Sequence, residues 1–447
     1  MNRKAINLGF IGLIPTLCFG LLAGAAIDVE FTPPVELPVG GAGGDVTTGD
    51  IDNDGDLDII TTTRNPYFFW VSINTGGGGF APATQHAAGT LPRAVIAVDF
   101  NNDTNLDIMT ANELVSDVTL MTGDGAGGFS LPRHFITAMR PMELASGDFN
   151  NDGLPDLAVT HKDSVAGVVV VRLNSGGVGA AWSGLGPATS YSVGAGSRSV
   201  TALDIDTDGD LDLVTTNRAD GTVSVLLGDG FGDFGTQLVF PAGVQPRDLT
   251  AGDFTGDGII DLAIADFGTG EALILPNLGV DLLFNTWNGL GPAVAYPGGG
   301  LAPHGIASGD LDIDGDLDLI VANVQSGNLS VMLNDGAGAF DDSFILVTGA
   351  FSAASVSIVD LDDDGDLDVV NANAESAGSS TIFFNATKTC PADFNNDGIV
   401  DTADLGVLLN FFNQNNSHVD LNADGVIDTA DLGILLGVFG VPCPTLP

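Results

Sequence analysis

The stretch DIDNDGDLD, residues 50–58, decides the fold of this chain because the chain repeats it. Versions of the pattern Asp-x-Asp-x-Asp-Gly-x-x-Asp begin at intervals of 49, 49, 56, 49, 57 and 50 residues, at Asp50, Asp99, Asp148, Asp204, Asp253, Asp310 and Asp360. A nearly constant period of this length indicates one supersecondary unit copied in tandem. The sequence therefore predicts a repeat architecture in which the copied element also carries chemistry.

The residues around the fourth copy indicate what the repeated unit is. An apolar strand, 199–203, leads into the loop, and a β-branched strand, 211–216, leaves it. Residues 222–227 alternate between apolar and polar, a glycine-rich turn follows, and 234–241 form a fourth strand. Four short antiparallel strands without helical periodicity are typical of a propeller blade. Seven copies therefore predict a mainly β, seven-bladed β-propeller.

The two ends of the repeat region predict how the ring closes. The seventh copy ends after its third strand, 380–385, so its fourth strand is missing. The segment 31–38 has the composition of the outer strands that begin at Phe80 and Phe129. We expect this N-terminal strand to pair with the last repeat and remove an open sheet edge.

The charge balance excludes some partners. Of 447 residues, 58 are Asp or Glu and only 12 are Lys or Arg, a formal net charge of −46. Such a chain repels nucleic acid and anionic membrane surfaces. A hydrophobic content of 44% argues against disorder. Because 33 of the 58 acids occupy the ligand positions of the seven loops or of two similar loops near the C-terminus, the charge indicates cation binding.

The loops have the ligand chemistry of a calcium site. Calcium takes six to eight oxygen ligands, and the acids at positions 1, 3, 5 and 9 supply them, while Gly at position 6 allows the backbone to turn. The copies at Asp50, Asp204, Asp310 and Asp360 are complete; the second copy, with Thr104 in place of the Gly, is the poorest. The alternative is a set of plain Asp-rich turns. The candidate ligands are Asp50, Asp52, Asp54, Asp58, Asp99, Asn101, Asp103, Asp107, Asp148, Asn150, Asp152, Asp156, Asp204, Asp206, Asp208, Asp212, Asp253, Thr255, Asp257, Asp261, Asp310, Asp312, Asp314, Asp318, Asp360, Asp362, Asp364 and Asp368.

These repeats resemble the FG-GAP/VCBS family, whose propellers occur in integrin α-chain heads, fungal lectins and many secreted bacterial proteins. The resemblance covers roughly residues 28–385. It implies the propeller fold and Ca²⁺, but it implies no single function, because the same scaffold serves unrelated tasks.

The N-terminus predicts export. Arg3 and Lys4 precede an apolar run, 5–26, and Ala23-Gly24-Ala25 fits a cleavage site, so we assign a signal peptide to 1–25. The alternative is a retained membrane anchor. We expect a secreted or cell-surface protein of a bacterium, with no membrane span after cleavage. Its two remaining cysteines, Cys390 and Cys443, are expected to form a disulfide.

The C-terminal segment, 389–447, has a different pattern. Two loops offset by 27 residues are each followed by leucines at helical spacing. Loops and helices together resemble a type I dockerin, a small α-helical calcium-binding module, which implies a cohesin-like partner. The alternative is a calcium-stabilised cap without such a partner. The candidate ligands are Asp393, Asn395, Asp397, Asp401, Asp404, Asp420, Asn422, Asp424, Asp428 and Asp431.

One set of cations is not explained by the fold. Six residues before the loop start stand Arg93, Arg198, Arg247 and His304, at the beginning of the innermost strand and opposite the loops. Connections between the second and third strands add Arg64, Lys162 and Arg218 to that face, with Arg140 beside them. Each Arg can simply brace a neighbouring blade. Our sharper hypothesis is a cationic channel mouth that binds an anionic ligand.

These features favour a non-catalytic role. We expect the propeller, 26–388, to bind a glycan or protein ligand, as an adhesion or binding module. The alternatives are a polysaccharide-degrading enzyme, a lyase or glycoside hydrolase, and a structural cell-envelope protein. The chain has no His-Glu-x-x-His and no Gly-x-Ser-x-Gly. Gly123-x-Gly125-x-x-Gly128 lies between two predicted strands, which indicates a hairpin turn and not a dinucleotide site.

Overall fold

A computed structural model describes residues 29–162, 165–281, 283–284, 286–374, 378–386, 392, 399–412, 421 and 426–440. Two compact units contain these residues. The first holds the described residues from 29 to 386, and the second those from 392 to 440. The predicted signal peptide, Cys390 and Cys443 lie outside the described residues.

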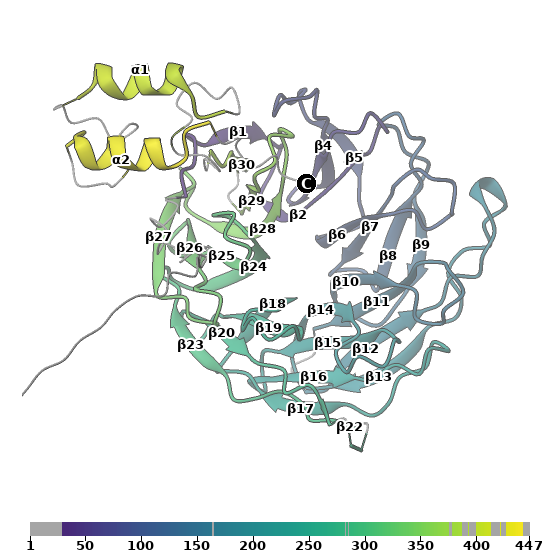
Figure 1. Cartoon of the computed structure of the whole chain (residues 1–447). Coiled ribbons are helices and arrows are strands. Elements are labelled where there is room, and N and C mark those ends of the chain that lie inside the picture. Colours follow the sequence, from purple (N-terminus) through teal and green to yellow (C-terminus); the bar gives the residue numbers. More distant parts are fainter. Residues whose placement is uncertain are drawn as a thin grey trace, which may run out of the picture. The chain divides into compact units, whose positions relative to one another are not determined.

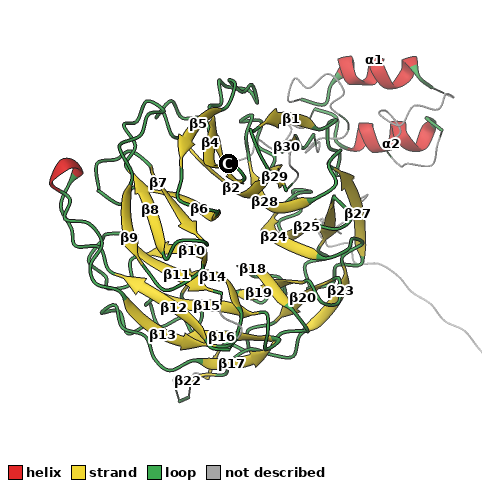
Figure 2. Cartoon of the chain, turned by 180° about the vertical axis from the view of Figure 1, so that it is seen from behind, coloured by secondary structure: helices red, strands yellow, loops and turns green. Residues whose placement is uncertain are grey.

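The first unit is a seven-bladed β-propeller, as the repeats predict. It consists of seven four-stranded sheets. Figures 1 and 2 show these sheets around one centre, each with its first strand innermost. Neighbouring strands within a sheet are antiparallel. The blades are β2 (Gly43–Gly49), β3 (Asp58–Arg64), β4 (Tyr67–Ser72), β5 (Thr84–Ala87); β6 (Pro92–Val98), β7 (Asp107–Asn112), β8 (Asp117–Met121), β9 (Arg133–Ile136); β10 (Pro141–Gly147), β11 (Asp156–His161), β12 (Gly167–Arg172), β13 (Thr189–Val193); β14 (Ser197–Leu203), β15 (Asp212–Asn217), β16 (Thr222–Leu226), β17 (Leu238–Pro241); β18 (Pro246–Gly252), β19 (Asp261–Asp266), β20 (Glu271–Leu275), β23 (Val294–Pro297); β24 (Pro303–Gly309), β25 (Asp318–Asn323), β26 (Asn328–Leu333), β27 (Asp342–Val347); and β28 (Ala353–Val359), β29 (Asp368–Asn373), β30 (Ser379–Phe383) with β1 (Val35–Pro38).

Both ends of the propeller chain build the seventh blade. Strand β1 pairs antiparallel with β30, Val35 opposite Ile382 and Pro38 opposite Ser379. An isolated bridge joins Phe31 to Asn385. The predicted closure by the N-terminal strand is confirmed. The longer third and fifth repeats carry a short 3₁₀ helix, η1 (Gly179–Ala181), and a small hairpin, β21 (Val280–Asp281) with β22 (Thr286–Trp287).

The core lies between adjacent blades. The second strand of each blade is buried along most of its length, because neighbouring sheets cover both of its faces. One cluster joins Val214 and Val225 of the fourth blade to Leu262 and Leu273 of the fifth. Position 2 of every loop is a buried apolar residue, such as Phe254, which anchors the loop to this core. Truncating a buried Phe of this kind to Ala costs about 3–5 kcal/mol.

An asparagine after the third strand connects neighbouring blades. Asn277 Nδ2 donates to the carbonyl of Ile260 in its own blade at 3.1 Å and of Ile205 in the preceding blade at 2.8 Å. Its Oδ1 accepts from Trp287 Nε1 at 2.7 Å and from Gly279 N at 3.1 Å. Asparagines at the equivalent position in four other blades reach the preceding blade in the same way: Asn74, Asn174, Asn334 and Asn385. These buried amides therefore fix the angle between blades through hydrogen bonds.

The second unit contains two short helices, α1 (Thr402–Asn410) and α2 (Thr429–Gly437). Their bounds are offset by 27 residues at the first residue, as the duplicated sequence predicts. The core includes Leu408 and Leu435, both fully buried. The helices confirm the helical spacing, while the loop residues before them fall mostly outside the described part of the chain. Across the described residues, every helix is too short or too polar to cross a membrane.

Candidate functional site

The loops at positions 50–58 and their copies turn through two left-handed residues. In the first loop Asn53 has φ 60° and Gly55 has φ 101°. Gly and Asn accept this conformation at low cost, which explains the Gly of the repeated pattern. Three β-branched residues occupy it against their preference: Thr104, with φ 75°, Thr207, with φ 59°, and Ile313, with φ 62°. These three loops therefore contain backbone strain.

Carboxylates at positions 1 and 5 hold the turn itself. The carboxylate of Asp50 accepts hydrogen bonds from the backbone N–H groups of Asp54 and Gly55, each at 3.1 Å. Asp54 Oδ1 accepts from Asp56 N at 3.0 Å. Similar bonds occur in the other copies, for example at Asp204 and Asp208. Position 5 thus shapes the loop, and its role as a cation ligand stays a prediction.

The acid at position 9 links the loop to the end of the third strand. Asp58 is buried and accepts from Ile51 N at 2.8 Å and from Asn74 N at 2.7 Å. The same pair of backbone donors serves all seven copies: Asp58, Asp107, Asp156, Asp212, Asp261, Asp318 and Asp368. Burial outweighs these donors and raises the pKa of Asp58 to about 6 and that of Asp318 to about 7. An ionised carboxylate here is therefore costly without a cation.

In four loops the carboxylate oxygens of positions 1, 3 and 9 lie within 4.8 Å of one another: Asp50, Asp52 and Asp58; Asp204, Asp206 and Asp212; Asp310, Asp312 and Asp318; Asp360, Asp362 and Asp368. These are the four copies that the sequence marks as complete. The Oδ1 atoms of Asp52, Asp206 and Asp362 are buried and have no hydrogen-bond partner among the described residues. Buried acceptors rarely lack a partner, so these oxygens fit a hard divalent cation.

The three other loops have fewer acidic ligands. Asn101, Asn150 and Thr255 stand at position 3 of the loops that begin at Asp99, Asp148 and Asp253. Thr255 Oγ1 donates to Asp261 Oδ2 at 3.0 Å, and this occupies one oxygen that a cation would use. Asn101 Oδ1 is buried without a partner among the described residues, so the second loop still offers an oxygen.

In the second unit, the described candidate ligands cap the helices. Asp401 Oδ1 accepts from Ala403 N at 2.7 Å, and Asp404 Oδ2 accepts from Asp401 N at 2.8 Å, a reciprocal capping box. Asp428 and Asp431 repeat the arrangement at α2. The remaining candidate ligands of this unit, Asp393, Asn395, Asp397, Asp420, Asn422 and Asp424, lie outside the described residues.

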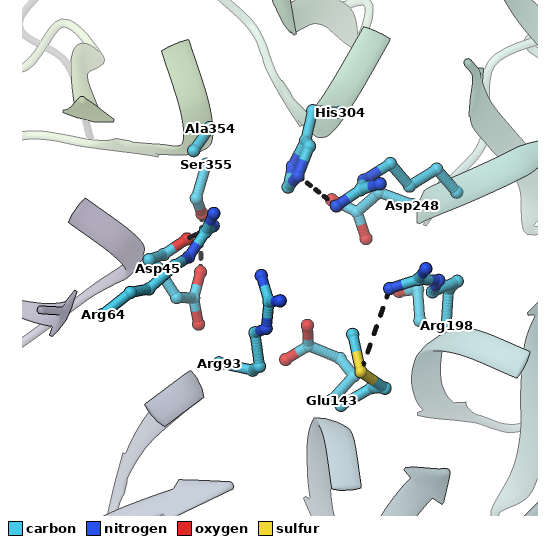
Figure 3. Close-up of a pocket in the computed structure, with 13 residues that line it drawn as sticks. Asp45, Arg64, Arg93, Glu143, Arg198, Asp248, His304, Ala354 and Ser355 are labelled. Carbon is cyan, nitrogen blue, oxygen red and sulfur yellow. Dashed lines mark hydrogen bonds between the residues drawn. The ribbon is translucent and has the colours of Figure 1, made fainter. Parts of the chain in front are cut away.

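A charged cavity of about 60 Å³ lies where the innermost strands begin, at the opposite end of these strands from the loops. Figure 3 shows side chains from several blades around it. Each innermost strand has a break in register near its start, such as between Pro92 and Ala94 in β6, and this β-bulge re-aims side chains. The lining residues are Gly44, Asp45, Arg64, Arg93, Met142, Glu143, Arg198, Ser199, Arg247, Asp248, His304, Ala354 and Ser355. We call this the channel cavity.

The channel cavity brings together Arg93, Arg198, Arg247 and His304, the four residues singled out in the sequence, and adds Arg64. The guanidinium groups of Arg64, Arg198 and Arg247 have few partners among the described residues. Arg64 Nη2 donates to Gly44 O at 2.9 Å, and Arg247 contacts His304 Nε2. The Nε atoms of Arg64 and Arg198 are buried without any partner among the described residues. Burial and the neighbouring arginines lower the pKa of both residues to about 10.

Three carboxyl groups in the cavity were missed by the sequence analysis. They belong to Asp45, Glu143 and Asp248, each one residue after the position that carries the arginines. None of them lies within ion-pair distance of an arginine, as far as the described residues show. Burial raises the pKa of Asp45 to about 6, and burial with the nearby acids raises that of Glu143 well above its usual range. Perturbed acids of this kind gather at functional sites.

Glu113 organises the rim beside the cavity. It accepts from Arg93 Nε at 2.5 Å and from Arg140 Nη2 at 2.9 Å, and Lys162 Nζ lies 3.5 Å away. Although burial opposes it, these cations lower the pKa of Glu113 to about 2. Arg93 is therefore braced by an acid, which is the simpler of the two roles considered for it.

A second cavity of about 320 Å³ shares Arg198 with the channel cavity. Lys162, Arg218, Val244 and Gln245 are among its lining residues. Arg218 Nη2 donates to Gln245 Oε1 at 2.7 Å, and its guanidinium carbon lies 4.5 Å from the centre of the Phe267 ring. Because Arg198 borders both cavities, a ligand in one is close to the other. We call the two cavities together the Arg-rich face.

Comparison with known proteins gives the family. The model of the FG-GAP-like repeat matches residues 50–110, 99–159, 148–215, 204–264 and 310–370, which together make up more than half of the chain. The chain belongs to this repeat family. No curated protein matches the chain significantly.

Two solved structures have a similar fold. A BBS1N structure in complex with ARL6DN has a TM-score of 0.53 at 12% identity, over 80% of this chain and 96% of that one. Virginiamycin B lyase from Staphylococcus aureus, in a catalytically inactive form with quinupristin, has a TM-score of 0.52 at 12% identity, over 79% of this chain and 99% of that one. At this identity the likeness shows the propeller fold alone.

Proposed function

We propose that this protein is an exported, calcium-binding propeller that acts as a non-catalytic binding module, with its ligand on the Arg-rich face. One observation carries the proposal. Arg198 and Arg247, which recur at one blade position in the sequence, line a single cavity with Arg64, and most of the donors of these three arginines have no partner among the described residues. Residues that only brace blades would have their partners within the protein.

Calcium supports this role by stabilising the fold. The four carboxylate clusters and their unpartnered oxygens supply the donor set that Ca²⁺ prefers. Extracellular calcium sites bind at roughly 0.1–1 mM, a level suited to an exported protein. The propeller would then be rigid outside the cell, and its ligand face would be pre-organised.

The ligand class follows from local charge. Because the chain as a whole is strongly acidic, an anion gains nothing from the overall field and must be captured by close contacts. Arginine forks bind carboxylate, sulfate and phosphate groups through paired hydrogen bonds. We therefore propose glycans that carry uronate or sulfate groups, or an acidic protein segment.

A glycan array with calcium in excess tests the proposal. Uronate-containing and sulfated oligosaccharides should be retained, and their neutral counterparts should not. The double change Arg198→Ala with Arg247→Ala should remove binding while the melting temperature stays nearly unchanged. Unfolding of this variant would show that the arginines are braces. Normal binding by a folded variant would place the ligand elsewhere.

A second candidate is a polysaccharide lyase or hydrolase. The carboxyl groups of Glu143 and Asp248 favour it, because burial raises the pKa of both, and a carboxyl group with a raised pKa can act as a general acid. The assay is the release of reducing ends or unsaturated products from any oligosaccharide that the array retains. Turnover that is lost in Glu143→Gln would establish the enzyme. Retention without turnover leaves the binding module.

For the second unit we propose a dockerin-like module with a cohesin-like partner. Its support is the duplicated helix with the same capping box in both copies. Titration of an isolated cohesin domain against the full chain, with and without calcium, tests it.

We also propose a disulfide between Cys390 and Cys443, which mass spectrometry of the exported protein would detect as a mass two hydrogen atoms below that of the reduced chain.

A further inference from the structure

The channel cavity contains three arginines, Arg64, Arg198 and Arg247, that have few hydrogen-bond partners among the described residues. Arg64, Arg198 and Arg247 each carry five N–H donors. Three contacts are found for these side chains: Arg64 donates to a carbonyl, Arg198 to a thioether sulfur at 3.8 Å, and Arg247 contacts an imidazole nitrogen. None of the three takes part in an ion pair within the described part of the chain. A buried guanidinium without an anion is unfavourable, so this arrangement calls for an anion from outside.

The cavity has the size of one small anion. Its volume of about 60 Å³ holds a few water molecules, or one sulfate, phosphate or carboxylate group in their place. The guanidinium groups come from several blades around it, so they approach from different sides (Figure 3). Trigonal and tetrahedral oxyanions accept hydrogen bonds in several directions at once, and a halide offers no such geometry.

We propose that the channel cavity is a binding site for a single oxyanion group, held by the guanidinium groups of Arg64, Arg198 and Arg247. This rests on the proposed function, because it names the chemical group that the Arg-rich face recognises. The group has two possible sources: a free inorganic ion, or a carboxylate or sulfate carried by a glycan.

The three carboxyl groups give the site a characteristic pH dependence. Asp45, Glu143 and Asp248 surround the same cavity, and as carboxylates they repel an oxyanion. Asp45 is held by Ser355 Oγ at 2.6 Å and Val95 N at 2.9 Å, so it cannot turn away. The other titratable groups at the cavity are His304 and Arg93; His304 is neutral, because burial and Arg247 lower its pKa well below the usual range. Binding should therefore take up protons and strengthen as the pH falls.

Calorimetry with sodium sulfate on the full chain, with calcium in excess, tests the proposal. We expect a Kd of about 1 mM or below at about pH 5, because the site places three cations on one ion. The pKa of Asp45 is about 6, which lies between about pH 7.5 and about pH 5. In this range, each proton that binding takes up makes the affinity for sulfate rise about tenfold for every pH unit by which the pH falls. Titrations in two buffers of different ionisation enthalpy measure that proton uptake directly.

Two variants and a control locate the site. Arg247→Gln should remove sulfate binding, and Arg133→Gln, an exposed arginine on β9, should not change it. Glu143→Gln should strengthen binding at about pH 7.5 and flatten the pH dependence, a gain that damage to the fold cannot produce. Absence of sulfate binding at both pH values, or binding that neither channel variant changes, would overturn the proposal.

The sources are distinguished by a uronate oligosaccharide. If it binds more tightly than sulfate and with the same response to the variants, the oxyanion group belongs to a glycan. If sulfate binds and the oligosaccharide does not, the site takes a free ion. Glycan retention on the array that is insensitive to Arg247→Gln and to pH would refute this inference and leave the proposed function intact.

Discussion

Removal of calcium should lower the melting temperature of the propeller by on the order of 10 °C. Four loops bring three carboxylates together. At a calcium concentration ten times the dissociation constant, each site adds about 1.4 kcal/mol, so four independent sites add about 6 kcal/mol. For a domain of this size 1 kcal/mol corresponds to about 2 °C, which gives the expected shift.

The size of the shift should depend on pH. Without metal, the folded-state pKa of Asp58 is about 6 and that of Asp318 is about 7, both above the ordinary value of 3.8. The folded state then binds more protons than the unfolded state, so the stability of the calcium-free protein falls as the pH rises from about 4 to about 7. Calcium binds the ionised form, and its effect should be larger at about pH 7.5 than at about pH 5.

Scanning calorimetry in calcium and in chelator measures both effects, and a reciprocal exchange of ligands provides the control. Asp206→Asn removes a position 3 carboxylate from a complete loop and should reduce calcium stabilisation by about a quarter. Asn150→Asp completes the third loop and should increase it. Equal melting with and without chelator would refute the calcium assignment. Changes in melting that are the same in both conditions would show that the exchanges act on the fold and not on metal binding.

Three further outcomes follow from side chains described above. Asn277→Ala should lower the free energy of unfolding by about 3–5 kcal/mol, because it removes four buried hydrogen bonds. Asn288 is exposed, so Asn288→Ala should change the free energy of unfolding little. Urea unfolding measures both variants. Thr104→Gly should stabilise the protein by about 1 kcal/mol, because it removes the backbone strain of a threonine with positive φ in the second loop. Gly153→Thr should destabilise the protein by a similar amount through the third loop. A loss of stability in Thr104→Gly would contradict this reasoning. Glu113→Gln should destabilise the protein by about 2–3 kcal/mol at neutral pH, because the carboxyl has a pKa of about 2 in place of 4.5. The contribution of this carboxylate to stability is present above about pH 4.5 and is lost as the pH falls toward 2. An acid titration in which the variant and the unchanged protein lose stability in parallel would count against this prediction.

The fold was accessible from the sequence because the repeats amplify weak signals. A single blade offers only four short strands, but seven copies at nearly one period reveal their common pattern. The seventh copy lacks a fourth strand, so the segment near Val35 is expected to pair there, as it does. The four complete loops were also identifiable, because the acid count at positions 1 and 3 is visible in the sequence. The contribution of position 9 to the fold was not, since one of its two backbone partners, Asn74 N in the first blade, lies outside the loop.

The acids of the channel cavity could not be found by strand periodicity. In a regular strand, neighbours point to opposite faces, so Asp248 would be expected on the side away from Arg247. The bulge between Pro246 and Asp248 breaks that alternation, and both side chains line the cavity. The available signal was the recurrence of an acid at one position in three blades: Asp45, Glu143 and Asp248. Bulge positions themselves depend on packing between blades and leave little trace in a single sequence.

The closure of the ring by β1 has a mechanical consequence. After β30 the chain makes the bridge between Asn385 and Phe31, so any load applied through the C-terminal unit reaches this bridge first and then β30. Strand β30 is held on one side by β1, in a pairing of only four residues, Val35–Pro38 against Ser379–Ile382. The Glu36 carboxylate adds a bond from Thr381 Oγ1 at 2.9 Å. If the C-terminal unit tethers the protein, tension will open the ring at this pairing, and the other six blades will still be intact when it does.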